Sequence, residues 1–294
     1  MERKLYIVDV FAEEKYSGNQ LAVITGAKGL STEEMQKIAQ EMNYSETTFI
    51  TGGDESSVEY AVRIFTPVEE IPFAGHPTLG TAYVILKEVL QKNVFLITLN
   101  MKVGKIPVLI DYKGDEPDLI WMEQPSPFFG KKVNPDQMAR SLDLPQGAIH
   151  SLFPVEEVST GFPFIVVPLK SLKYVQEAKI IQKRFEEVVS EYTAKAVLIF
   201  ASETYSPKNQ LNVRVFCPLH GIPEDPATGS ANGCLAAYLV KHGFFESDEI
   251  DIRVEQGYEI GRKSLIYLRS QNNQGNIVVN VGGKVVMIAR GELV

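Results

Sequence analysis

The sequence predicts a mixed α+β chain of two duplicated lobes, each a curved, mostly antiparallel sheet or barrel around a central helix. The first observation behind this prediction is that a segment of the first half recurs in the second half. The second is that each half holds many short strand patterns but only about two helix patterns. A doubly wound parallel sheet would alternate strands and helices, so this composition of elements favours a sheet wrapped around one helix.

The clearest repeat joins residues 62–72 and 213–223, which share Val, Arg, Phe, Pro, Ile and Pro in register without a gap. Weaker echoes link residues 17–24 to 160–167, and 122–125 to 254–257, in the same order along the chain. Matches in one order indicate an internal duplication. We therefore expect an N-terminal lobe over residues 1–125 and a C-terminal lobe over residues 126–294. The last strand is free to pack back on the first lobe, and the active site is expected between the lobes.

Alternation and β-branched content carry the strand predictions, and 3.6-residue spacing carries the helices. Strands are predicted over residues 5–11, 48–51, 58–65, 94–100, 105–111, 119–123, 162–168, 196–201, 211–217, 250–255, 264–269 and 277–288. Helices are predicted over residues 32–42, 77–90, 135–142, 180–191 and 226–242.

Composition excludes several classes of function. The 294 residues carry a net charge of −8 and no basic run, so neither nucleic acid nor an anionic membrane is an expected partner. No stretch approaches the apolar length of a membrane helix. The four histidines show no metal-ligand spacing, and nucleotide-binding glycine motifs are absent, so we expect neither a metal nor a cofactor. Two cysteines and no signal pattern at the N-terminus fit the cytoplasm.

The loops that follow the repeated segments lead into helices rich in small residues. Pro77 and Pro226 suit a first helical turn, and exposed N–H groups at a helix start bind anions without any Lys or Arg. The loops also differ, because Gly75-His76 occupies the place of Asp225-Pro226. Taken alone, His76 is open to a packing role and Asp225 to a helix N-cap role. Glu46, before a predicted strand, is equally open to being a solvated strand end.

Six motifs together resemble the phenazine-biosynthesis PhzF-like family over residues 5 to 290. They are Ser17-Gly-Asn-Gln20, Asn43-Tyr-Ser-Glu-Thr47, Phe65-Thr-Pro67 with Pro72-Phe-Ala-Gly-His-Pro-Thr78, Gly161-Phe-Pro163, Gly221-Ile-Pro-Glu-Asp-Pro-Ala-Thr-Gly-Ser-Ala231 and Glu255-Gln-Gly257. The part from Glu224 to Ala231 is the most specific. The resemblance implies the two-lobed fold of diaminopimelate epimerase and a homodimer. It also implies a cofactor-independent isomerase that transfers a proton on a small carboxylate-bearing substrate.

The resemblance also implies the site. Glu46, His76 and Asp225 are the expected catalytic residues; Gly75, Thr78, Gly229, Ser230 and Gln256 are the expected substrate-binding residues. Racemases of this fold use two opposed cysteines, but Gly75 and Asp225 stand near those places here. Cys217 and Cys234 fall elsewhere, and we expect both to serve packing.

Two other functions stay open at this point. An epimerase, racemase or dehydratase of amino or hydroxy acids needs acids and bases on opposite faces of its substrate, and Glu46 with Asp225 can supply them. A non-catalytic interaction protein would keep the fold alone.

Overall fold

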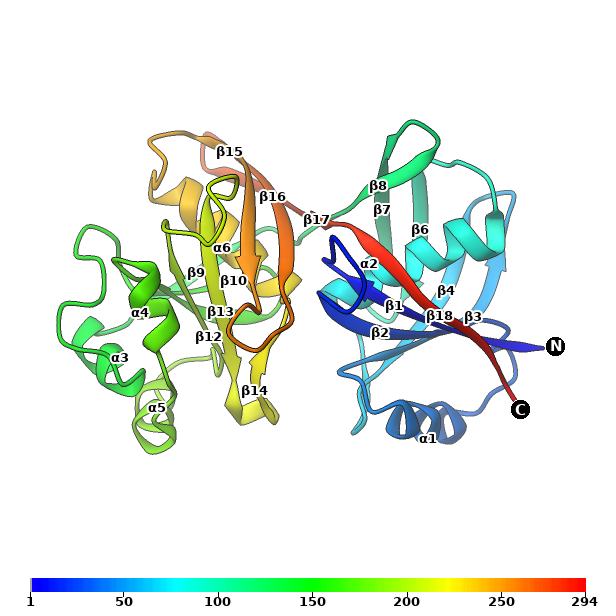
Figure 1. Ribbon diagram of the computed structural model, residues 1–294, viewed down its shortest axis with the longest axis horizontal. Helices are drawn as coiled ribbons and strands as arrows, with labels where there is room; N and C mark the ends of the chain where they lie inside the picture. The colour runs from blue at the N-terminus through cyan, green and yellow to red at the C-terminus, as the bar shows by residue number, and fades with distance from the viewer. Residues whose placement is uncertain (1) are drawn as a thin grey trace. The chain divides into compact units, whose positions relative to one another are not determined.

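The computed structural model describes residues 2–294 and divides the chain into two compact units (Figure 1). The first unit holds the chain up to Glu123 together with Gly282–Val294, and the second holds Gln124–Val281. The last strand of the chain thus belongs to the first unit.

The elements of the first unit are β1 (Arg3–Val10), β2 (Asn19–Ile24), α1 (Thr32–Met42), β3 (Thr47–Asp54), β4 (Glu59–Phe65), β5 (Glu70–Ile71), α2 (Gly75–Val84), the π-helix η1 (Ile85–Leu90), β6 (Leu96–Met101), β7 (Gly104–Lys113), β8 (Glu116–Glu123) and β18 (Val285–Leu293). The remaining elements are β9 (Phe128–Lys132), α3 (Pro135–Ser141), β10 (Glu156–Ser159), β11 (Pro163–Pro168), α4 (Leu172–Glu177), α5 (Gln182–Val189), β12 (Val197–Ala201), β13 (Leu211–Cys217), the 3-10 helix η2 (Pro218–His220), β14 (Ile222–Asp225), α6 (Gly229–Lys241), β15 (Glu249–Gln256), β16 (Ser264–Asn273) and β17 (Asn276–Gly283).

The order of strand pairings is the same in both units. In the first, β1–β2 is antiparallel, β2–β3 parallel, β3–β4 antiparallel, β4–β6 parallel and β6–β7 antiparallel. In the second, β10–β11, β11–β12, β12–β13, β13–β15 and β15–β16 follow the same sequence of directions. The repeated segments begin in β4 and β13, which hold the same place in this order. The duplicated, sheet-rich fold predicted from the sequence is confirmed.

The duplication extends to side chains. Arg63 of β4 binds both carboxylate oxygens of Glu70 and lies over the Phe65 ring, with its guanidinium carbon 5.1 Å from the ring centroid. In β13, Arg214 binds both oxygens of Glu224 and lies 4.7 Å from the Phe216 centroid. A bidentate arginine stacked on an aromatic ring is a directional contact that fixes each strand to the short strand after it.

One helix in each unit is buried on all sides. Nine of the ten residues of α2 are buried, as are eleven of the thirteen residues of α6. A helix that is apolar all round belongs in a core. Within its own unit, α2 contacts β1, β2, β3, β6, β7, β8 and β18, and α6 contacts β10, β11, β15 and β16 (Figure 1). A Cβ on Gly80 would lie 2.6 Å from a methyl of Leu21, so this glycine permits the close approach of α2 to β2.

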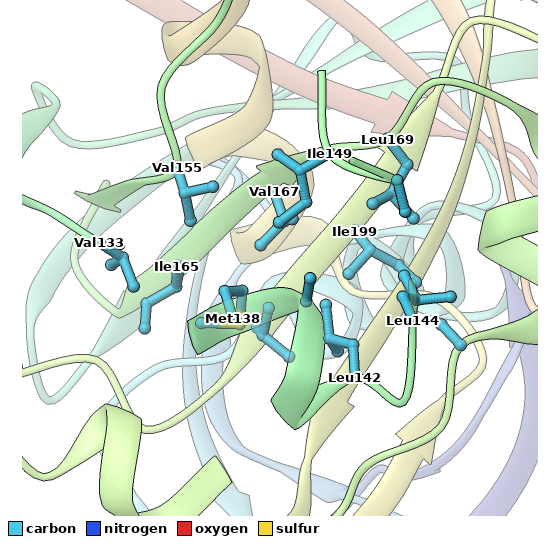
Figure 2. Packing of buried hydrophobic residues seen from close by; sticks show 14 of the residues in the cluster. Val133, Met138, Leu142, Leu144, Ile149, Val155, Ile165, Val167, Leu169 and Ile199 are labelled. Atoms are coloured by element: carbon cyan, nitrogen blue, oxygen red, sulfur yellow. The ribbon is translucent and has the colours of Figure 1, made fainter. Parts of the chain in front are cut away.

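The remaining helices cover the outside of the sheets. In the second unit, Met138 and Leu142 at α3 pack against Ile165 of β11 and Ile199 of β12 (Figure 2). In the first unit, α1 begins with a capping box between Ser31 and Glu34 and buries only its apolar stripe.

Several predicted elements differ from those observed. Strands β2, β5, β9, β10 and β14 and helix α4 were not predicted, because they are short or lack a clear alternation of apolar and polar residues. The single strand predicted over residues 277–288 is two strands, β17 and β18. The helix predicted from residue 226 begins at Gly229, and the one predicted from residue 77 begins at Gly75.

Candidate active site

Glu46 and His76 are brought together within the first unit. Glu46 precedes β3, after α1 ends at Asn43 in a left-handed conformation, and His76 is the second residue of α2. Nε2 of His76 lies 3.2 Å from Oε2 of Glu46, with side-chain exposures of 7% and 15%. The two groups are thirty residues apart in the sequence, yet they form one nearly buried acid–base pair.

The proton position on His76 follows from its other contact. Burial lowers the pKa of His76 to about 3, against a weaker opposing effect of a hydrogen bond to the Gln20 carbonyl. Nε2 is close to Glu46 but is not aligned for a hydrogen bond with any described residue, so the nitrogen that donates to Gln20 is Nδ1. A neutral imidazole protonated on Nδ1 presents a lone pair at Nε2. His76 therefore presents a hydrogen-bond acceptor, Nε2, toward Glu46.

A second set of groups lies in the second unit. Asp225 ends β14 and is 8% exposed. The Thr228 hydroxyl donates a very short hydrogen bond to Oδ2 of Asp225. Thr228 is the N-cap of α6, but its hydroxyl turns to Asp225 instead of the helix N–H groups. Asp225 is thus not an N-cap, and its carboxylate is oriented by a neighbouring hydroxyl.

The predicted equivalence of Gly75-His76 and Asp225-Pro226 is wrong. Gly75 is the first residue of α2, whereas Asp225 lies in a strand and Pro226 precedes the first helical residue, Gly229. Counted from the helix starts, Gly75 matches Gly229 and His76 matches Ser230. The second unit inserts a short loop between Asp225, the end of β14, and Gly229, the start of α6.

Both helix starts are suited to an anion. The N-cap residues Ala74 and Thr228 give no side-chain capping bond, and neither first turn contains an acidic residue. The first N–H groups of α2 and α6, at Gly75 and Gly229, therefore have no cap of their own, as an anion site requires.

The predicted substrate-binding side chains differ in their availability. Thr78 is fully buried and its hydroxyl donates to the Ala74 carbonyl at 2.7 Å, so this side chain is engaged within its helix. Ser230 is half-buried in the first turn of α6. Gln256 is fully buried, and its amide is occupied by the loop that contains Asp225.

The sequence did not indicate the roles of two further residues. They are Gln20, whose carbonyl fixes the His76 tautomer, and Thr228, whose hydroxyl orients Asp225. Both lie inside motifs that resemble the family. Their roles depend on a backbone carbonyl and a hydroxyl that contact the site only in the folded chain.

The two cysteines lack the properties of a catalytic base. Cys217 and Cys234 are buried, and burial raises the pKa of each thiol to about 12. A thiol with that pKa is almost entirely protonated near neutral pH, so very little thiolate is present to act as a base. Their packing role is in line with the expectation from sequence.

Comparison with known proteins places this architecture. A probable proline racemase of Agrobacterium radiobacter K84 covers 99% of this chain and 93% of its own, with a TM-score of 0.64 and 11% identity, which is a likeness of fold. A PhzF-family phenazine biosynthesis protein of Bacillus anthracis covers all of both chains with a TM-score of 0.89 and 27% identity. The fold and the site define a two-lobed α+β enzyme with the architecture shared by racemases and PhzF proteins.

The sequence comparisons are more specific. The model of the phenazine biosynthesis-like protein family matches residues 8–291. A trans-2,3-dihydro-3-hydroxyanthranilate isomerase of Pseudomonas chlororaphis is 34% identical over 289 residues, covering 98% of each chain. The chain belongs to the phenazine biosynthesis-like protein family and is an enzyme of its isomerase class. The predicted family and enzyme class are confirmed. Within residues 2–294, none of the helices has the length and apolarity to cross a membrane.

Proposed function

We propose that the chain catalyses a proton transfer within a small carboxylate-bearing molecule, without a cofactor, using Glu46 as the acid–base group. The observation that carries this proposal is the buried contact between Glu46 and the Nε2 lone pair of His76. The Pseudomonas relative is named for an isomerase of a dihydro-hydroxyanthranilate. A cyclic, unsaturated carboxylate of that kind is therefore the first candidate substrate.

The reaction has two balanced steps. The Glu46 carboxylate removes a proton from a carbon next to the conjugated system, and the electron pair of that C–H bond enters the system. The protonated Glu46 then returns the same proton to another carbon, so nothing is gained or lost overall. A positioned acid–base group contributes about 10²- to 10⁴-fold in rate.

Glu46 holds the proton between the two steps, and His76 is proposed to stabilise the protonated form. Because Nε2 of His76 is unprotonated, it can accept a hydrogen bond from the Glu46 carboxylic acid. The low pKa of His76 keeps the imidazole itself neutral near pH 7. Gly75 and Gly229 are proposed to bind substrate through their N–H groups, and Ser230 through its side chain. Asp225 is proposed to act on the substrate in the same reaction.

Isotope transfer tests the proposal. Trans-2,3-dihydro-3-hydroxyanthranilate deuterated at the carbon that loses its proton should give product that retains part of the label in ordinary water. Partial retention follows from one nearly buried base that keeps the deuteron until it is delivered. Complete loss of label combined with inversion of a stereocentre would instead identify the two-base epimerase.

We further propose a cytoplasmic homodimer. The support is the family resemblance, the two unpaired thiols and an apolar patch of Leu96 and Leu109, which are paired across β6 and β7 and are 45% and 50% exposed. Sedimentation of the wild type and of Leu109→Glu tests it, and the variant should be a monomer.

A further inference from the structure

The side chain of Gln256 is fully buried at the end of β15 and uses its whole hydrogen-bonding capacity on one loop. Nε2 donates to the Asp225 carbonyl at 2.8 Å and to the Thr228 hydroxyl at 3.0 Å. Oε1 accepts from the Thr228 N–H at 3.1 Å and from the Asn232 amide at 2.8 Å. A carboxamide has two N–H donors and two acceptor lone pairs. Nothing of this amide is left for a substrate.

The orientation of the amide is fixed by one backbone group. The N–H of Thr228 can only donate, so the atom of Gln256 that faces it must be the oxygen. The nitrogen must then face the Thr228 hydroxyl. That hydroxyl accepts one proton from Gln256 and has a single proton of its own, which points to Oδ2 of Asp225.

We propose that Gln256 is a positioning residue that aims the Asp225 carboxylate through Thr228, and that it does not contact the substrate. The chain of hydrogen bonds runs from the Gln256 amide to the Thr228 hydroxyl and from there to the Asp225 carboxylate. Because one N–H of Gln256 is donated to the Thr228 hydroxyl, the single proton of that hydroxyl is left for Asp225. A hydroxyl held in this way fixes the rotamer of the carboxylate. The catalytic consequence rests on the proposed role of Asp225.

The surroundings of the loop support the same conclusion. The Ser264 hydroxyl donates to the Pro226 carbonyl at 2.8 Å. Gly257, the residue after Gln256, has a φ of +77°, and a Cβ there would lie 2.6 Å from that same carbonyl. The ends of β15 and β16 therefore clamp the Asp225–Thr228 loop, and this clamp holds the loop out of α6.

The structural test compares crystal structures of matched variants. Gln256→Glu keeps the size of the side chain but turns both donors into acceptors, and Thr228→Val keeps the shape but removes the hydroxyl. Both should displace the Asp225 carboxylate from its present position, while Thr228→Ser should retain it. Gln210→Glu is the control, since Gln210 makes similar bonds to the Arg253 N–H and the Lys208 carbonyl. An Asp225 carboxylate that stays in place in Gln256→Glu and Thr228→Val would overturn the proposal.

The kinetic test uses trans-2,3-dihydro-3-hydroxyanthranilate. Gln256→Glu and Thr228→Val should each lower kcat about 10- to 100-fold, the range of a hydrogen bond to a charged group, with KM changed less than about twofold. Thr228→Ser should recover most of the rate. In an Asp225→Asn background neither variant should lower kcat further; independent losses there would show a merely structural role. If this compound is not turned over, the proposed substrate fails while the crystal structures still decide the role of Gln256.

Discussion

Nε2 of His76 faces Oε2 of Glu46 at 3.2 Å while the Gln20 carbonyl holds the other ring nitrogen. The imidazole thus donates to the Gln20 carbonyl on one side and presents an acceptor to Glu46 on the other. Glu46 contacts the acceptor side, so a proton on Glu46 would face the Nε2 lone pair.

We expect Glu46→Gln to lower kcat by about 10²- to 10⁴-fold, because the amide cannot take up a proton. Folding should be preserved, since the amide has the size of the carboxylate and an N–H group that can face Nε2 of His76. Turnover and thermal unfolding measured on the same preparations check both statements. Glu41→Gln, an exposed change on α1, is the control and should behave as wild type. Full activity in Glu46→Gln would move the role of base to Asp225 or His76.

The buried neutral His76 should make the protein lose stability in acid. The pKa of an unfolded histidine is near its ordinary value of 6.5, whereas burial lowers the pKa of His76 in the folded protein to about 3. Between these values the unfolded state binds one more proton than the folded state. The free energy of unfolding should therefore fall as pH decreases, by up to about 1.4 kcal/mol per pH unit from this group.

His76→Asn removes this titration while keeping a donor for the Gln20 carbonyl. Urea unfolding at a series of pH values from 7 to 4 should show a shallower loss of stability in this variant than in the wild type. His150→Asn, on a loop of the second unit, is the matched control for a change from histidine to asparagine. Equal slopes for His76→Asn and the wild type would mean that the pKa of His76 is the same in the folded and the unfolded protein.

The sequence predicted the duplicated fold because its signal is repeated and local. Val62 and Val213 open the same Arg–x–Phe pattern, and the structure uses both copies in the same way. It did not predict where α6 begins. The loop after Asp225 is held by Gln256 and Ser264, which lie more than twenty-five residues further along the chain. Contacts of that kind leave no trace in periodicity or capping patterns.

The candidate site was found only in part for the same reason. Glu46, His76 and Asp225 were named from motifs that resemble a family, and the structure pairs the first two directly. Gln256 was named as a substrate contact, but its amide is consumed by the loop. The roles of Gln20 and Thr228 are roles of orientation, which depend on three-dimensional placement and not on residue type.

Replacement of both cysteines by serine should leave turnover intact. Burial raises the pKa of Cys217 and Cys234 to about 12, so only about one thiol in ten thousand is ionised at pH 8. For the same reason a thiol reagent should label the folded wild type very slowly and the urea-unfolded chain rapidly. Loss of activity in a folded double variant would restore a thiol mechanism.

Gly257→Ala tests the clamp on the Asp225 loop. Gly257 has a φ of +77°, and a Cβ there would lie 2.3 Å from the Arg262 carbonyl and 2.6 Å from the Pro226 carbonyl. Gly261 in the same turn has a similar φ of +72° but has nothing within 4 Å of such a Cβ. Both substitutions place a side chain in the left-handed region, at a cost of about 1–2 kcal/mol. Only Gly257→Ala adds a clash with fixed backbone, for about 1–3 kcal/mol more.

The difference between these two variants isolates the clash from the backbone strain. Chemical unfolding should show Gly257→Ala to be the less stable, and its kcat should fall because the Asp225 loop must shift to admit the methyl group. Gly261→Ala should keep its kcat, since its turn can hold the methyl group without moving Pro226. Equal stability and equal kcat in the two variants would show that the Asp225–Thr228 loop does not depend on the packing of β15 against it. The hydrogen bonds of Gln256 would then have to hold Asp225 alone.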